Sequence, residues 1–196
     1  GAKIGPGQID QLLRQNGIRY LSEMMNFPGV LNEDEEVMAK IASAKKYNKP
    51  VDGHAPGLKG EQAKKYAAAG ITTDHECFTI EEAIDKIRSG IKVQIREGSA
   101  AKNFDALSEL IGKYPDEIMF CSDDKHPNDL IRGHMNEIVR RAINLGYDPV
   151  SVLRICCLNP VMHYGLDVGL LQPGDPADFI MVDDLNTDVG FLGDKN

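Results

Sequence analysis

The sequence predicts an α/β fold with parallel β-strands, in the form of a partial (β/α)8 barrel of the TIM type. Short apolar runs alternate with helical patterns along most of the chain, which is typical of a parallel sheet. About five strand–helix units follow one another, and their strands start about 20 to 30 residues apart. A complete barrel needs eight units and about 250 residues, so we expect the carboxyl-terminal part of a barrel without its first three units. No glycine-rich phosphate loop follows a strand, which disfavours a nucleotide-binding doubly wound sheet.

Five short segments are predicted to be strands, and segments with helical spacing lie before and between them. The predicted strands are residues 18–21, 50–53, 71–74, 92–96 and 118–121. The predicted helices are residues 8–16, 33–47, 61–69, 80–89, 103–112, 130–145, 149–158 and 160–164.

Local signals support the boundaries of several predicted helices. Gly17 and Gly70 follow the first and third helices, as glycine often does at a helix end. The second helix begins with the acidic residues 33–36, which favour a helix amino terminus. Thr79 and Glu82 form a capping-box pattern at the start of the fourth helix.

The last part of the sequence differs in composition from the rest. Residues 165–176 are rich in Gly and Pro, and residues 177–183 form a short apolar segment. We expect this segment to be a strand that leaves the barrel. The predicted domains are therefore the partial barrel over residues 1–165, and a linker with the start of a second domain over residues 166–196.

Composition and charge exclude several classes of function. Apolar content of 42% and charged content of 27% are ordinary for a soluble globular protein. A net charge of −8 argues against a large surface for nucleic acid or for an anionic membrane. No apolar run is long enough to span a membrane and no signal peptide is evident, so we expect a cytoplasmic protein. The four cysteines form no CxxC pair and are expected to be buried, reduced thiols.

Four residues suited to metal binding each follow a predicted strand: Glu23, His54, His75 and Asp123. The carboxyl ends of parallel strands converge at one mouth of a barrel. Two carboxylates and two imidazoles converging there are what a hydrolytic metal centre requires. Asp124 competes with Asp123, because neighbours on a strand point to opposite faces and only one of them would point into the mouth.

Two of these residues suggest chemical roles as well as ligation. Glu23 lies in an apolar stretch, where an unpaired carboxylate is costly and a cation would remove that cost. We expect Glu23 to bridge two metal ions. Asp123 is suited to bind a metal and to accept a proton from water.

The segment 96–103 follows the fourth strand and combines charged residues, a glycine and small residues. This composition suits a loop that contacts a substrate, although an ordinary helix-capping loop explains it equally well. Position alone suggests a set of residues that contact the substrate: Glu76, Arg96, Glu97, Ser99, Asp124 and His134.

With these residues in place, the chain resembles the amidohydrolase superfamily, most closely its adenine deaminase branch. The resemblance covers nearly the whole chain and rests on segments that are specific in their order and spacing. These are residues 23–30 (EMMNFPGV), 52–57 (DGHAPG), 74–77 (DHEC), 96–103 (REGSAAKN) and 120–124 (FCSDD). Residues 158–166 and 173–178 resemble the superfamily's exit from the barrel to a β-sandwich domain.

The resemblance implies a binuclear metal site, with manganese or iron and with zinc as a further possibility. Glu23 would bridge the metals, His54 and His75 would hold one of them, and Asp123 would bind the other and act as general acid and base. The implied reaction is hydrolytic deamination of adenine by water, which yields hypoxanthine and ammonia. Another amidohydrolase acting on a purine or a cyclic amide, or a catalytically silent domain, is the alternative.

One departure from the family pattern is large. The superfamily has a His-x-His pair after its first barrel strand, and this sequence contains five histidines but no such pair. The isolated chain is therefore expected to be inactive. It is also expected to form homo-oligomers or to associate with the missing barrel segment, because open sheet edges favour pairing.

Overall fold

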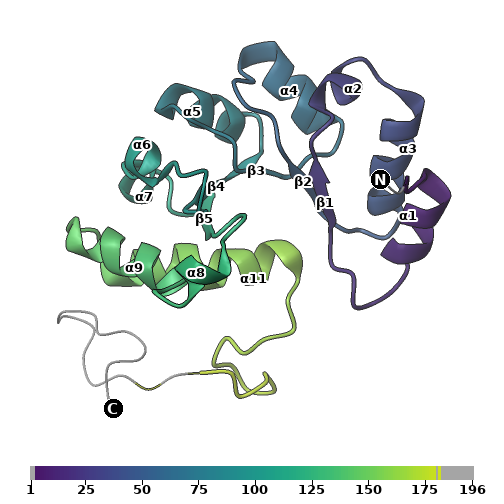
Figure 1. The fold of residues 1–196 in the computed structure, drawn as a ribbon. Helices are drawn as coiled ribbons and strands as arrows, with labels where there is room; N and C mark the ends of the chain where they lie inside the picture. Colours follow the sequence, from purple (N-terminus) through teal and green to yellow (C-terminus); the bar gives the residue numbers. More distant parts are fainter. Residues whose placement is uncertain (1–2, 180, 182–196) are drawn as a thin grey trace. The chain divides into compact units, whose positions relative to one another are not determined.

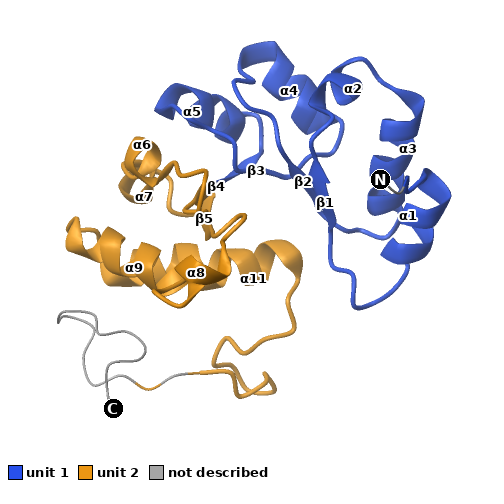
Figure 2. Ribbon diagram, viewed as in Figure 1, with its two compact units in different colours: residues 1–94 blue, residues 95–196 orange. Residues whose placement is uncertain are grey.

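The computed structural model describes residues 3–179 and 181. Its strands form one sheet in the order β1-β2-β3-β4-β5, which confirms the predicted α/β fold (Figure 1). The pairings of β1 with β2, β2 with β3 and β3 with β4 are parallel. The strands are β1 (Leu21–Met24), β2 (Val51–Gly53), β3 (Thr73–Asp74), β4 (Lys92–Arg96) and β5 (Ile118–Cys121). The chain divides into two compact units, Gly1–Gln94 and Ile95–Asn196, which are described in turn (Figure 2).

Unit 1 consists of strand–helix repeats that follow the predicted order. Its helices are α1 (Pro6–Leu13), α2 (Phe27–Leu31), α3 (Glu35–Lys46), α4 (Gly60–Ala68) and α5 (Ile80–Arg88). Helices α3, α4 and α5 lie on the same side of the strands (Figure 1). The short helix α2 was not predicted; Asn26 caps it, with its side chain accepting a hydrogen bond from the backbone N–H of Gly29.

The apolar core of unit 1 lies between these helices and the strands. Its members are buried residues of α1, α2, α3, α4, β2 and the connecting loops, together with Leu21 and Met24 of β1. Ile41, at the centre of α3, is 1% exposed, and Ala44 one turn later is fully buried. The helical spacing of apolar residues in α3 therefore packs the helix against the sheet.

Truncating Ile41 to alanine should destabilise unit 1 substantially. The buried side chain loses its transfer free energy and leaves a cavity, so we expect the free energy of unfolding to fall by about 2–5 kcal/mol. Urea unfolding followed by circular dichroism would measure this. Leu12→Ala, at a side chain 40% exposed, is the control and should change stability by less than about 0.5 kcal/mol. Equal, small effects of both changes would contradict the packing described here.

Strand β1 carries an irregularity next to a candidate site residue. Leu21 pairs with Val51 and Met24 pairs with Gly53, so the register shifts between the two pairs. Leu21 and Met24 are nevertheless both buried, although residues three apart on a regular strand face opposite sides. The strand begins at Leu21 and not at residue 18, so the predicted bounds of 18–21 were wrong. Glu23 consequently lies within β1 instead of beyond its end.

Unit 2 contains the end of β4, β5 and a set of short helices. These are α6 (Phe104–Leu107), α7 (Leu110–Lys113), α8 (Pro127–Leu130), α9 (Met135–Asn144), α10 (Pro149–Leu153), a π-helix (Arg154–Leu158) and α11 (Asn159–Tyr164). The predicted helix over 130–145 is interrupted, because Gly133 adopts a φ of 154° before α9 begins. The predicted helix over 103–112 is likewise divided into α6 and α7.

Contacts within unit 2 hold its helices against β5. The rings of Phe104 and Phe120 lie 6.3 Å apart, and the guanidinium of Arg141 lies 4.5 Å above the Phe104 ring. The Asn159 amide donates hydrogen bonds to the carbonyls of Pro115 (2.7 Å) and Ile118 (2.8 Å). These bonds join the start of α11 to the amino-terminal end of β5.

The cysteines depart from the prediction of uniformly buried thiols. All four are reduced, but only Cys77 is buried, whereas Cys157 is exposed. Burial raises the pKa of the Cys77 thiol. A hydrogen bond from Cys156 lowers the pKa of Cys157 to about 7.

The end of the chain leaves part of the prediction open. Residues 177–179 and 181 belong to no strand, and residues 180, 182 and 183 of the predicted exit strand lie outside the described residues. The β-sandwich and the domain boundary after residue 165 stay predictions. Among the described residues, no helix is long and apolar enough to cross a membrane.

Candidate metal centre

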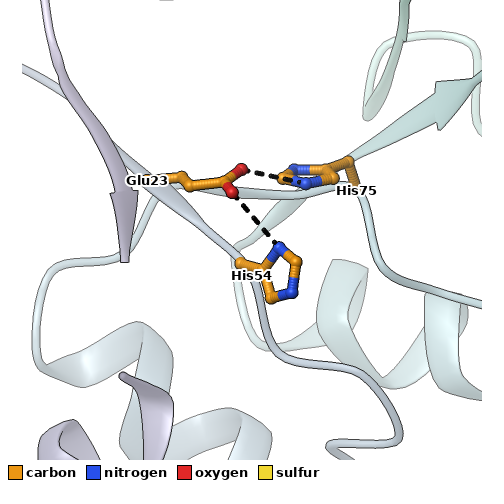
Figure 3. A group of neighbouring side chains, drawn as sticks. All are labelled: Glu23, His54 and His75. Carbon is orange, nitrogen blue, oxygen red and sulfur yellow. Dashed lines mark ion pairs between the residues drawn. The ribbon is translucent and has the colours of Figure 1, made fainter. Parts of the chain in front are cut away.

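Three of the predicted ligands converge in unit 1. Glu23 comes from β1, His54 follows β2 and His75 follows β3, and one potential ligand atom of each lies within 4.8 Å of the others. Figure 3 shows the Glu23 carboxylate pointing toward both imidazole rings. Its Oε2 atom is 3.0 Å from His75 Nε2, and its Oε1 atom is 3.4 Å from His54 Nδ1. The strand order thus brings together residues that are one or two strand–helix units apart in sequence.

The geometry of this cluster suits a divalent cation. Two ligand atoms that each lie about 2.1 Å from one ion are at most about 4.2 Å apart, and the two spacings to Glu23 fall below this limit. The Nδ1 atom of His54 is buried and has no hydrogen-bond partner among the described residues. A buried polar atom without a hydrogen-bond partner lowers the stability of the folded protein. Nitrogen and oxygen ligands are those that zinc, iron and manganese accept.

Glu76 joins the same cluster, although the sequence suggested only a substrate contact for it. It is 6% exposed, and its Oε1 atom lies 3.4 Å from His54 Nδ1 and 3.6 Å from His75 Nε2. Strand alternation would direct Glu76 away from His75. Because β3 ends at Asp74, His75 and Glu76 lie in the loop after the strand, where neighbouring side chains can face the same side.

Backbone geometry around His54 depends on Gly53 and Tyr66. A Cβ on Gly53 would lie 2.5 Å from the carbonyl oxygen of Thr73, so only glycine permits this approach of β2 to β3. The Tyr66 hydroxyl donates to the carbonyl of Met24 (2.9 Å) and accepts from the N–H of His54 (3.1 Å). Burial raises the pKa of Tyr66 and keeps this hydroxyl protonated. Tyr66 therefore links β1, which contains Glu23, to the loop that contains His54.

Asp123 and Arg96 form an ion pair within unit 2. Arg96 Nη1 lies 2.9 Å from Asp123 Oδ2, and both side chains are largely buried. Asp123 has a φ of 52°, a conformation uncommon outside glycine and often found at functional sites. Asp124 is exposed, and its carbonyl accepts a hydrogen bond from the N–H of Ser99. Of the two candidates, Asp123 is the one whose carboxylate is held by a buried cation.

The other predicted substrate residues of unit 2 make local contacts. Ser99 donates a hydrogen bond to Asp129 (2.5 Å) and accepts one from the N–H of His126. Glu97 pairs with Arg141 at 3.2 Å, and it lines a surface cavity of about 520 Å³. His134 precedes α9 as its N-cap residue. These contacts explain the local structure of the loops and do not test the predicted roles.

Comparisons with known proteins find relatives that match nearly the whole chain. Residues 4–196 match the family model described as "Amidohydrolase family". The chain is 61% identical to the adenine deaminase of Sulfurovum sp. (strain NBC37-1), over 94% of this chain and 35% of that protein. It is 58% identical to the adenine deaminase of Salinibacter ruber, over 95% of this chain and 34% of that protein. The chain therefore spans about a third of the length of the curated relatives it matches.

A solved structure supports the fold independently. A TatD homologue of Escherichia coli, YjjV, superposes with a TM-score of 0.54 over 82% of this chain and 70% of that one. Sequence identity is 14%, so this likeness concerns the fold alone.

Proposed function

Since the chain belongs to the amidohydrolase family, we propose that it forms part of the catalytic barrel of an adenine deaminase. The proposed reaction is the hydrolysis of adenine by water to hypoxanthine and ammonia. Its support from relatives is the name adenine deaminase, shared by proteins 50–61% identical to this chain. Because the chain spans about a third of those relatives, the activity is assigned to the longer protein.

The observation that carries the proposal is the convergence of Glu23, His54 and His75. We propose that His54 and His75 would hold one divalent ion, that Glu23 would be shared between this ion and a second one, and that Asp123 would bind the second ion. Manganese, iron and zinc all accept this set of ligands. The buried Nδ1 atom of His54 is accounted for if it binds metal.

The catalytic roles follow from the chemistry of the side chains. Metal ions bound here would make water nucleophilic at neutral pH. We propose that the Asp123 carboxylate accepts a proton from the attacking water and returns it to the departing ammonia. Arg96, paired with Asp123 at 2.9 Å, would orient that carboxylate. Glu76, buried beside both histidines, is the proposed contact to the substrate.

The remaining ligands and partners are assigned to the longer protein. This sequence has no His-x-His pair, so we propose that the second metal obtains its histidines from another segment. Strand β1 lies at an edge of the described sheet, and an edge strand offers unpaired backbone groups to a further strand. We propose that the missing barrel segment, or a second copy of the chain, pairs there. We also propose that the enzyme is cytoplasmic.

Metal-dependent deamination is the test of this proposal. The full-length protein, stripped with a chelator, should lose hypoxanthine formation from adenine and should recover it with Mn²⁺ or Fe²⁺. The isolated 196-residue chain should show no deamination above the buffer rate under either condition. Absorbance of adenine and hypoxanthine in the ultraviolet follows the reaction. Full activity of the stripped protein would overturn the metal mechanism, and activity of the isolated chain would overturn its expected dependence on the missing segment.

A further inference from the structure

Helix α5 directs a charged pair into the interior of unit 1. Lys86 is fully buried and Glu82 is 2% exposed, and Lys86 Nζ lies 3.0 Å from Glu82 Oε1. Lysine and glutamate are almost never fully buried unless paired. Neither residue belongs to the candidate metal centre, so their burial requires a separate explanation.

Lys86 connects the loops that follow β2 and β3. Its ammonium donates to the carbonyl of Ala55 (2.7 Å), to Asp74 Oδ1 (2.9 Å) and to Glu82 Oε1 (3.0 Å). An ammonium has three donors, and all three are used. Burial is the largest single influence and lowers the pKa of Lys86, but Asp74, Cys77 and Glu82 together outweigh it and raise the pKa overall, so the group stays charged. Ala55 follows His54, and Asp74 precedes His75.

The two carboxylates join the same loops through backbone N–H groups. Asp74 Oδ2 accepts from the N–H of Ala55, and Asp74 Oδ1 accepts from the N–H of Glu76, both at 2.8 Å. Glu82 accepts from the N–H of Gly57 at 2.8 Å, and its other oxygen accepts from that of Phe78 at 3.1 Å. Lys86, Asp74 and Glu82 each bond to the loop after β2, and Asp74 and Glu82 also bond to the loop after β3.

The stability of the fold does not by itself require a buried ion pair with this many directed hydrogen bonds. A buried ion pair is often no more stabilising than apolar residues of similar volume, because desolvation offsets the attraction. Directed hydrogen bonds, in contrast, determine where backbone groups lie. The bonds of Lys86 and Asp74 end on residues adjacent to His54 and His75, so they fix backbone groups next to both imidazoles.

We propose that Lys86 and Glu82 are positioning residues for the metal centre, which hold the loops of His54 and His75 at the spacing that one divalent ion requires. This inference rests on the proposed function. It assigns the buried pair a role in metal affinity, through the loops, and no contact with substrate.

Metal affinity of the full-length protein provides the test. Lys86→Met keeps the length of the side chain and removes its charge and donors. We expect the dissociation constant for Mn²⁺, measured by electron paramagnetic resonance at a temperature where every variant is folded, to rise about 10-fold to 100-fold. Glu82→Gln, which keeps the shape of the side chain, should raise it by a smaller factor of at least about threefold.

A matched control separates positioning from lost stability. Ile41→Ala should destabilise the same unit, because Ile41 belongs to its apolar core. Ile41 lies in α3 and makes none of the hydrogen bonds of the Lys86 network. Its Mn²⁺ affinity should stay within twofold of the wild type. An unchanged affinity in Lys86→Met, or an equal loss in Ile41→Ala, would overturn the inference; if Lys86→Met does not fold, Glu82→Gln is judged by the same criteria. Failure of the wild type to bind Mn²⁺ would overturn the metal centre itself, and the inference with it.

Discussion

Replacing His75 with alanine in the full-length protein should remove metal from the site and nearly abolish deamination. His75 is the most buried member of the cluster, and its Nε2 atom lies 3.0 Å from Glu23. Metal ions contribute several kcal/mol to the stabilisation of such transition states. A loss of about 4 kcal/mol corresponds to a rate about 1,000-fold lower. Metal content by plasma mass spectrometry and turnover on adenine would both be measured.

A histidine outside the cluster provides the control for this experiment. His163 lies in α11, where its ring packs edge-on against Tyr164 at 4.8 Å. His163→Ala should retain the metal content and the turnover of the wild type. If His75→Ala retained both as well, His75 could not be a ligand.

Gly53→Ala should disrupt both the sheet and the site. The added Cβ would lie 2.5 Å from the carbonyl oxygen of Thr73 and 2.7 Å from Ile71 Cγ2. Because the first of these atoms is backbone, β2 and β3 must separate to relieve the clash. We expect the free energy of unfolding to fall by about 3 kcal/mol. Metal affinity should fall as well, since His54 follows Gly53 directly. Chemical denaturation and Mn²⁺ titration would measure the two effects.

A second glycine provides a control that shows whether the steric clash causes these losses. Gly7 lies inside α1, and a Cβ there meets nothing within 4 Å. Gly7→Ala should leave metal binding unchanged and should stabilise the protein slightly, by up to about 1 kcal/mol, because alanine favours helices. A Gly53→Ala protein as stable as this control would show that β2 and β3 can separate at little cost.

The sequence predicts an element best where the pattern of residues within that element determines its limits. Strands 92–96 and 118–121 appear in the structure with the predicted limits. The first alternates polar and apolar residues and the second is a short apolar run, and both patterns are local. The predicted helix over 130–145 was wrong at its start, since its apolar spacing continues across Gly133 while the helical backbone begins only at Met135. The start of β1 was also misplaced. Its register depends on pairing with β2, which no local pattern encodes.

Some residues of the candidate site could be predicted from the sequence and others could not. His54 and His75 could be found because strand ends converge in a parallel sheet, and the structure brings their side chains together with Glu23. Lys86 could not be found, because a lysine in an amphipathic helix is normally assigned to the solvent face. Glu82 was assigned to a capping box, and half of that prediction is right: Thr79 accepts from its N–H. Its carboxylate instead serves the loops of the histidines.

The irregular register of β1 makes the site sensitive to the length of the chain as well as to its residue types. Between the paired residues Leu21 and Met24 there are two residues, opposite a single residue of β2. Exchanging Ser22 for another residue would leave this count intact. Removing it would slide the chain by one place and turn Glu23 away from the histidines, because neighbours along a strand face opposite sides. A survey made only of substitutions would therefore miss this constraint, which insertions and deletions would expose.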